Sequence, residues 1–255
     1  MAALSLAALR SQVESDLRGR VTAPFSYRDR NIFEVAPSGI LEIDSSVGGL
    51  PRGAMTEICG LPGSGRSSLL VSVLASRTEN GEVCALVDAR DSFDPQTACA
   101  AGVDLRQLLW VRCQNIDQAL RATDLLIQSG GFGLVAVDLS DLAPKTVRYV
   151  PLNAWFRFRR AVEDTPTVLM ILDQEANAKN CASLVLRLDA EAVRWSETVK
   201  SADCGTLPFC GKKMDAAAQG YSFARLFEGF SVRTEIIRSR MQSSNGLAPA
   251  VAAHG

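Results

Sequence analysis

Short apolar runs alternate with helix-like segments along most of the chain. The runs are typical of strands buried on both faces of a parallel sheet, and they occupy residues 54–59, 82–88, 108–113, 134–138 and 167–172. Helices are predicted between them, over residues 67–77, 94–101, 115–129 and 151–163. Residues 182–195 and 230–238 alternate in polarity, which favours antiparallel strands. The pattern therefore predicts an α/β fold, with a mainly parallel twisted sheet, flanking helices and antiparallel strands at the C-terminal edge.

The two ends of the chain differ from this central pattern. Residues 3–18 carry Leu4, Leu6, Leu9 and Val13, which predicts a short amphipathic helix that packs on its own domain or on a neighbouring subunit or partner. The last residues are rich in Ala, Pro, Ser and Gly, as in disordered tails. We expect an N-terminal helix and linker over residues 1–37, one core over 38–240 and a disordered tail over 241–255.

The most informative stretch lies between the first predicted strand and its helix. It consists of Gly60, Leu61, Pro62, Gly63, Ser64, Gly65, Arg66, Ser67 and Ser68. A strand, a glycine-rich turn and a helix form the setting of a phosphate-binding loop, in which backbone N–H groups and the helix N-terminus face the phosphate. The hydroxyl of Ser67 is in position to ligate Mg²⁺. The alternative is a glycine-rich turn that binds nothing.

One residue of this loop departs from the pattern G-x-x-x-x-G-K-[ST]. Arg66 stands where the pattern has lysine, so the charge remains but a planar fork replaces a compact ammonium group. We expect the loop to bind a nucleotide phosphate with altered geometry. Efficient hydrolysis of that nucleotide is a weaker expectation than binding.

Three further residues follow predicted strands and so face the same sheet edge. Asp138 is the candidate Mg²⁺ ligand beside Ser67, although strand-end aspartates also cap helices and turns. Asp91 is the candidate base for hydrolysis, but nothing in the sequence directs it toward a phosphate. Gln174 is either a sensor of the γ-phosphate or a solvated loop residue.

Residues 155–160 interleave aromatic and basic side chains. On a helix Trp155 and Phe158 would pack on the sheet and leave Arg157, Arg159 and Arg160 solvated. The alternative is that these arginines hold single-stranded DNA or an acidic partner.

Composition and charge exclude several classes of protein, including membrane-spanning ones. The net charge of −1 provides no global basic field for DNA or membranes, and no apolar run is long enough to span a bilayer. The seven cysteines are scattered, and Cys204 and Cys210, with a lone His254, do not make a convincing zinc site. Residues 1–18 lack the pattern of a signal peptide, so we expect a cytoplasmic protein with no membrane partner.

Several segments together resemble the ATPase core of the RecA family. They are residues 50–53, 55–60, 87–89, 94–95, 100–104, 137–139, 143–145 and 172–174, in the family's order. The resemblance implies a RecA-like phosphate-loop NTPase core with ATP and Mg²⁺ as cofactors. It also implies possible homo-oligomers.

The departures from RecA fall at positions that bind nucleotide, catalyse hydrolysis or bind DNA in that family. Arg66 replaces the family's lysine, Arg90 replaces its catalytic glutamate, and the segments that correspond to its two DNA-binding loops are short. This truncated pattern is similar to the ImuA family. The resemblance implies that the protein acts in damage-induced translesion synthesis, with an ImuB-like Y-family polymerase homologue and RecA as partners.

Three functions remain open at this point. The first is an accessory protein with weak or vestigial ATP binding. The second is a DNA-dependent ATPase recombinase that binds single-stranded DNA. The third is a regulatory phosphate-loop protein unrelated to DNA.

Overall fold

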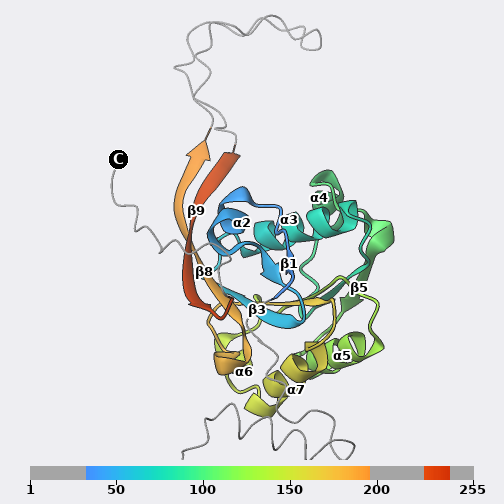
Figure 1. Cartoon of the computed structure of the whole chain (residues 1–255). Helices are drawn as coiled ribbons and strands as arrows, with labels where there is room; N and C mark the ends of the chain where they lie inside the picture. Colours follow the sequence, from blue (N-terminus) through green and yellow to red (C-terminus); the bar gives the residue numbers. More distant parts are fainter. Residues whose placement is uncertain (1–32, 196–226, 242–255) are drawn as a thin grey trace, which may run out of the picture.

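A seven-stranded sheet organises the protein, and its strands run in the order β5-β4-β6-β7-β3-β8-β9 (Figure 1). The computed structural model describes residues 33–195 and 227–241. All neighbouring strands are parallel except β8 and β9, which are antiparallel. The α/β prediction is therefore confirmed. The strands are β3 (Ala54–Cys59), β4 (Cys84–Asp88), β5 (Leu108–Arg112), β6 (Leu134–Asp138), β7 (Val168–Asp173), β8 (Leu184–Trp195) and β9 (Phe227–Ser239).

Helices cover both faces of the sheet (Figure 1). One face packs on α5 (Ile116–Ser129) and α7 (Leu152–Val162), and the other packs on α3 (Arg66–Glu79) and α4 (Pro95–Ala100). Because both faces are covered, the central strands are apolar without alternation, and every residue of β3, β4 and β7 is buried.

Capping side chains place the helix starts close to their predicted positions. Asn115 accepts a hydrogen bond from the backbone N–H of Gln118 at 2.9 Å, and Asp94 accepts from Gln96 and Thr97 at 3.1 Å each. These bonds satisfy N–H groups that have no partner within the helix.

Several short elements escaped prediction. Helices α2 (Leu41–Val47) and α6 (Pro144–Arg148) and the 3₁₀ turns η1 (Leu105–Gln107) and η2 (Lys179–Cys181) bury at most one residue each, so they leave little periodicity to read. Strand β1 (Val35–Ala36) pairs with β2 (Leu50–Pro51), so residues assigned above to the linker lie in a small second sheet.

The last two strands extend beyond the rest of the sheet as a two-stranded arm (Figure 1). β3 pairs with β8 only from Thr56↔Leu184 to Cys59↔Arg187, whereas β9 follows β8 as far as Trp195. Ion pairs cross the arm between Arg233 and Glu191 at 2.6 Å and between Arg187 and Glu235 at 3.6 Å. The predicted helix over 3–18, the loop with Cys204 and Cys210, and the tail lie outside the described residues.

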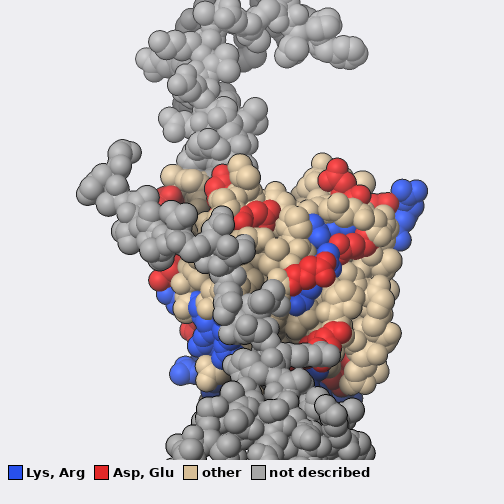
Figure 2. All heavy atoms as spheres, in the orientation of Figure 1, with Lys and Arg blue, Asp and Glu red and all other residues tan. Residues whose placement is uncertain are grey.

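Acidic and basic side chains are interspersed on the face that Figure 2 shows. This mixture agrees with the net charge of −1. None of the described helices is long and apolar enough to cross a membrane. No cluster of three or more His, Cys, Asp or Glu side chains suited to a metal occurs in the part of the chain that the structure describes.

Candidate nucleotide-binding site

The loop between β3 and α3 has backbone geometry that requires glycine at three positions. Gly63 and Gly65 have φ values of +81° and +92°, in the left-handed region, and Gly65 is the N-cap of α3. At Gly60 an added Cβ would lie 2.4 Å from the carbonyl oxygen of Leu188 and 2.5 Å from Ser64 Oγ. The glycines therefore allow the left-handed turns of the loop and its close passage against β8.

Arg66 begins α3, and its side chain turns inward. The residue is only 6% exposed, and its Nη1 donates no hydrogen bond to any described residue. The hydroxyl of Ser64, in the same loop, is also buried without a partner. A buried cationic donor without an acceptor carries a desolvation cost that an anionic ligand would offset. These atoms therefore fit a phosphate group.

Arg66 also acts on the strand beside the loop. Burial raises the pKa of Asp173, at the end of β7, to about 6, while the charge of Arg66 works in the opposite direction. Asp173 uses its two oxygens to accept from the backbone of Gln174 and the amide of Asn177, each at 2.6 Å. Arg66 thus has an acidic neighbour but keeps an unused donor.

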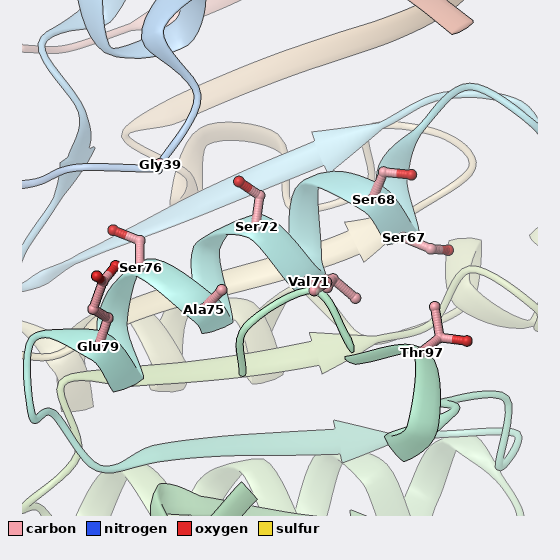
Figure 3. A pocket seen from close by; sticks show the side chains of 10 residues that line it. Gly39, Ser67, Ser68, Val71, Ser72, Ala75, Ser76, Glu79 and Thr97 are labelled. Carbon is pink, nitrogen blue, oxygen red and sulfur yellow. The ribbon is translucent and has the colours of Figure 1, made fainter. Parts of the chain in front are cut away.

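Two hydroxyls stand in the first turn of α3. Ser67 and Ser68 are exposed and line a groove of about 610 Å³ that runs along α3 toward Thr97 of α4 (Figure 3). The groove leaves the start of the helix open to a ligand.

Asp138 ends β6, one strand beyond β7 in the sheet order. It accepts a hydrogen bond from the backbone N–H of Ser140 at 2.9 Å. Burial is the main cause that raises the pKa of this carboxyl, and the charges of Asp141 and Asp88 add to it. A carboxylate placed among acids in a poorly solvated position is a suitable Mg²⁺ ligand, because the ion would relieve both penalties. Ser67 and Asp138 are the residues that would hold it.

Gln174 bridges two strand ends. Its amide nitrogen donates to the carbonyl oxygens of Ser140 at 2.9 Å and Leu142 at 3.4 Å, so it ties the end of β7 to the segment after β6. The residue is neither a free solvated side chain nor, in this arrangement, committed to a phosphate. Its role as a γ-phosphate sensor stays a prediction.

Asp91 is held by Arg112 of β5. Its Oδ1 accepts from Arg112 Nε at 2.5 Å, and its Oδ2 accepts from Arg112 Nη2. The hydrogen bonds from Arg112 lower the pKa of Asp91, which makes it a weaker proton acceptor. Its role as a base stays a prediction, and the ion pair is an obstacle to it.

The neighbouring Asp88 is structural. Its carboxylate accepts from the backbone N–H groups of Arg90 and Phe93 and from the indole of Trp110, at 2.9 to 3.3 Å. These bonds hold the loop after β4 in place. Arg90 itself is exposed at the surface of that loop.

The aromatic and basic segment of α7 serves mainly to build the core. Trp155 and Phe158 are 2% and 0% exposed, which confirms the packing predicted for them. Arg157 bonds Asp124 at 2.9 Å, and Arg159 lies 3.7 Å from Glu163, so two of the three arginines have acidic partners. The buried rings are not available to stack on bases.

The structure brings together a basic hollow that sequence reasoning missed. Lys145 and Arg148 of α6 and the exposed Tyr149 face Lys179 across a hollow of about 590 Å³, whose wall includes Glu175, Ala176 and Asn177. We call this set the basic hollow. Its two sides are about thirty residues apart in sequence and meet only because β6 and β7 are neighbours. The sequence signal was limited to Lys145 and Arg148 after β6 and a single lysine, Lys179, after β7.

A second missed residue is Glu57, in the middle of β3. It is 1% exposed, and its Oε1 accepts from the backbone N–H groups of Asn177 at 2.6 Å and Ala178 at 2.8 Å. Burial raises its pKa to about 7. A single charged residue within an apolar run was the signal that could have found it.

Comparison with known proteins agrees with this geometry. Residues 7–148, more than half of the chain, match the RecA N-terminal domain. The chain is similar to Protein RecA of Ruegeria pomeroyi, with 40% identity over 116 residues, or 44% of this chain and 33% of the relative. It is 37% identical to Protein RecA of Ectopseudomonas oleovorans and 34% identical to that of Pseudomonas putida, each over 144 residues, or 55% of this chain and 41% of the relative.

The matched region spans well under half the length of these relatives. The family match over residues 7–148 includes the glycine-rich loop, Asp91 and Asp138, and of the basic hollow it includes only Lys145 and Arg148. The strand order, the loop and the family match agree, and the chain belongs to the RecA N-terminal domain family.

Proposed function

We propose that this protein is a RecA-type accessory factor of the DNA-damage (SOS) response. It binds ATP with Mg²⁺ at residues 60–68, turns the nucleotide over slowly, and supports mutagenic translesion synthesis in the cytoplasm. It does so through contacts with an ImuB-like polymerase homologue and with RecA. The observation that carries the proposal is the buried Arg66, whose Nη1 has no acceptor among the described residues. The candidate base, Asp91, is already paired with Arg112.

Arg66 and Asp91 together favour nucleotide binding over nucleotide hydrolysis. The loop conformation and Arg66 favour a bound phosphate, whereas hydrolysis also needs a group that orients water. Asp91 is in an ion pair, and Arg90 stands at the position of the family's glutamate, so neither of these two positions supplies such a group. Binding without rapid turnover suits a protein that reports nucleotide state to a partner.

Calorimetric titration tests the first part of the proposal, that the protein binds ATP with Mg²⁺. We expect ATP with Mg²⁺ to bind the wild type and Asp138→Ala to lose the Mg²⁺-dependent part. Asp117→Asn, exposed on α5 at the opposite face of the sheet from α3, should match the wild type. A folded wild type that binds neither ATP nor ADP would overturn the proposal.

The rate of ATP hydrolysis by the purified protein tests the second part of the proposal, that turnover is slow. We expect slow phosphate release that single-stranded DNA does not stimulate strongly. Rapid turnover that is lost in Asp138→Ala would instead favour the recombinase alternative.

The partner proposal is tested by co-expression with the ImuB-like polymerase homologue. We expect the two proteins to co-purify through gel filtration, and separate elution at micromolar concentration would count against the accessory role.

The basic hollow favours a second candidate function, the binding of single-stranded DNA. Lys145, Arg148 and Lys179 supply charge for phosphates, and Tyr149, which is 82% exposed, supplies a ring for stacking. Arg160 of α7 remains the other candidate contact, because it is exposed and has no acidic partner among the described residues.

Fluorescence anisotropy with labelled oligothymidylate separates these two surfaces. We expect a Lys145→Ala, Arg148→Ala double variant to weaken binding and to flatten its salt dependence, because fewer counterions are released. Arg160→Ala is the comparison variant, and a larger loss there would place the DNA on α7.

A further inference from the structure

Glu57 connects the phosphate-loop strand with the wall of the basic hollow. It lies three residues before Gly60 on β3, and the two N–H groups that it accepts belong to Asn177 and Ala178. Asn177 lines the hollow, and the adjacent Ala178 is fully buried. One carboxyl therefore fastens the segment 175–179 to the strand that leads into the nucleotide site.

The hydrogen bonding of this carboxyl is incomplete. Oε1 accepts two backbone bonds, but Oε2 is buried and has no partner among the described residues. A buried carboxylate oxygen without a donor is costly when it is charged and much less so when it carries a proton. The closed segment therefore favours the neutral acid, and an ionised Glu57 gains solvation if the segment opens.

Charged and titratable groups from neighbouring elements lie near the Glu57 carboxyl. Asp173 on β7 opposes ionisation of Glu57, and Arg238 on β9 favours it, while the thiols of Cys59 and Cys181 lie within electrostatic reach. Burial is the largest influence and raises the pKa of Glu57 to about 7, in spite of the two backbone bonds. Asp173, with its pKa near 6, is the group whose titration must be separated from that of Glu57.

We propose that Glu57 is a positioning residue that holds segment 175–179 closed against β3 when it is neutral and releases the segment when it is ionised. The wall of the basic hollow is therefore more ordered in mildly acidic than in mildly alkaline solution. Because the same strand leads into the phosphate loop, the hollow and the nucleotide site share one mechanical support.

Amide hydrogen exchange at Asn177 and Ala178 tests this directly and needs no ligand. In the wild type we expect their protection, corrected for intrinsic exchange, to fall between pH 6 and pH 8, by at most about tenfold per pH unit for one proton. The core amide of Ala136 in β6 reports global unfolding and should change less. Wild-type protection that stays flat, or that follows Ala136, overturns the proposal.

Three variants assign the effect. Glu57→Gln mimics the neutral acid, so protection should stay high at both pH values. Glu79→Gln removes an exposed carboxylate and should behave as the wild type. Asp173→Asn should keep the pH step but move its midpoint to lower pH, because it removes a like charge. A step that persists in Glu57→Gln and vanishes in Asp173→Asn would assign it to Asp173 and refute the role of Glu57. If Glu57→Gln fails to fold, Asp173→Asn decides: a step that persists there supports Glu57, and a step that vanishes refutes its role.

A second readout rests on the proposed DNA binding. We expect the affinity of the wild type for oligothymidylate to vary with pH over the same range, and that of Glu57→Gln to vary less. If oligothymidylate does not bind the wild type at all, the DNA proposal fails while the exchange result stands by itself.

Discussion

At the scale of single residues, Arg66 is the most consequential departure from the phosphate-loop pattern. A lysine would present a compact ammonium, whereas this guanidinium is buried near Asp173 and keeps one nitrogen without an acceptor. The substitution preserves charge at the helix start but changes the shape of the donor. Its effect on nucleotide affinity is therefore open to direct measurement.

We predict that Arg66→Ala weakens ATP binding and that Arg66→Lys retains it. A charge-assisted hydrogen bond to a phosphate contributes about 1.5–3 kcal/mol, so the alanine variant should lose at least tenfold in affinity. Isothermal titration calorimetry measures the affinity, with circular dichroism to verify the fold. Equal affinity in the alanine variant would remove Arg66 from the site.

Glu57 makes the free energy of unfolding depend on pH, and the raised pKa of its carboxyl gives the direction of that dependence. Its pKa is raised from the ordinary 4.5 to about 7, so the folded state keeps the proton to higher pH than the unfolded chain does. The favourable contribution is complete below pH 4.5 and is lost as the pH rises through 7. The full effect is about 3 kcal/mol in free energy of unfolding.

We therefore predict that Glu57→Gln is close to the wild type in stability at pH 5 and more stable at pH 8. Urea unfolding at the two pH values measures the difference. Parallel pH dependence in the two proteins would show that another group, such as Asp173, is responsible.

At the scale of elements, the amino ends of the strands are held by a small ionic network. Glu82 accepts from Arg52 at 2.6 Å and from Arg77 at 3.2 Å, and Arg77 has a side chain only 3% exposed. Arg52 also donates to the carbonyl of Pro166, so the network ties the start of β3 to α3 and β7. It lies opposite the carboxyl ends where the nucleotide site is built.

We predict that Glu82→Gln lowers the free energy of unfolding by about 2 kcal/mol, because it leaves a buried guanidinium without its anion. Glu163→Gln is the matched control, since its contact with Arg159 is 3.7 Å long and partly exposed, and it should cost less than about 0.5 kcal/mol. Chemical unfolding monitored by fluorescence compares the two. Equal losses would mean that burial of Arg77 does not decide the cost.

At the scale of the whole molecule, the nucleotide site and the basic hollow occupy one edge of a single sheet. Six parallel strands, joined in five neighbouring pairs, bring Gly60, Asp138 and Gln174 to their carboxyl ends, while the arm of β8 and β9 extends past them. A ligand that binds this edge binds only the folded protein. Ligand binding should therefore stabilise the entire sheet.

We predict that ATP with Mg²⁺, at about one hundred times its dissociation constant, stabilises the wild type by about 2.7 kcal/mol. Thermal unfolding followed by calorimetry should show a higher midpoint with ATP and Mg²⁺ than with ATP alone. In Asp138→Ala the two midpoints should coincide, and a persistent Mg²⁺ effect there would place the ion elsewhere.

Much of this architecture was readable from the chain. The seven strands of the main sheet were predicted within two or three residues, because apolar runs bounded by turns leave few alternatives. The caps Asn115 and Asp94 marked helix starts by local chemistry. Short helices such as α2 and α6 were missed because they bury almost no residues. Local signals thus predict elements in proportion to their length and burial.

The amino-acid sequence by itself determined the α/β class and the glycine-rich loop of the candidate nucleotide site, since both depend on residues adjacent in the chain. Only the tertiary structure decided that Arg66 is buried with a spare donor, that Asp91 is paired with Arg112, and that Glu57 fastens segment 175–179. These facts depend on contacts between strands distant in sequence, and on burial, which sets the cost of each charge. Such contacts exist only after the sheet has brought its strand ends together.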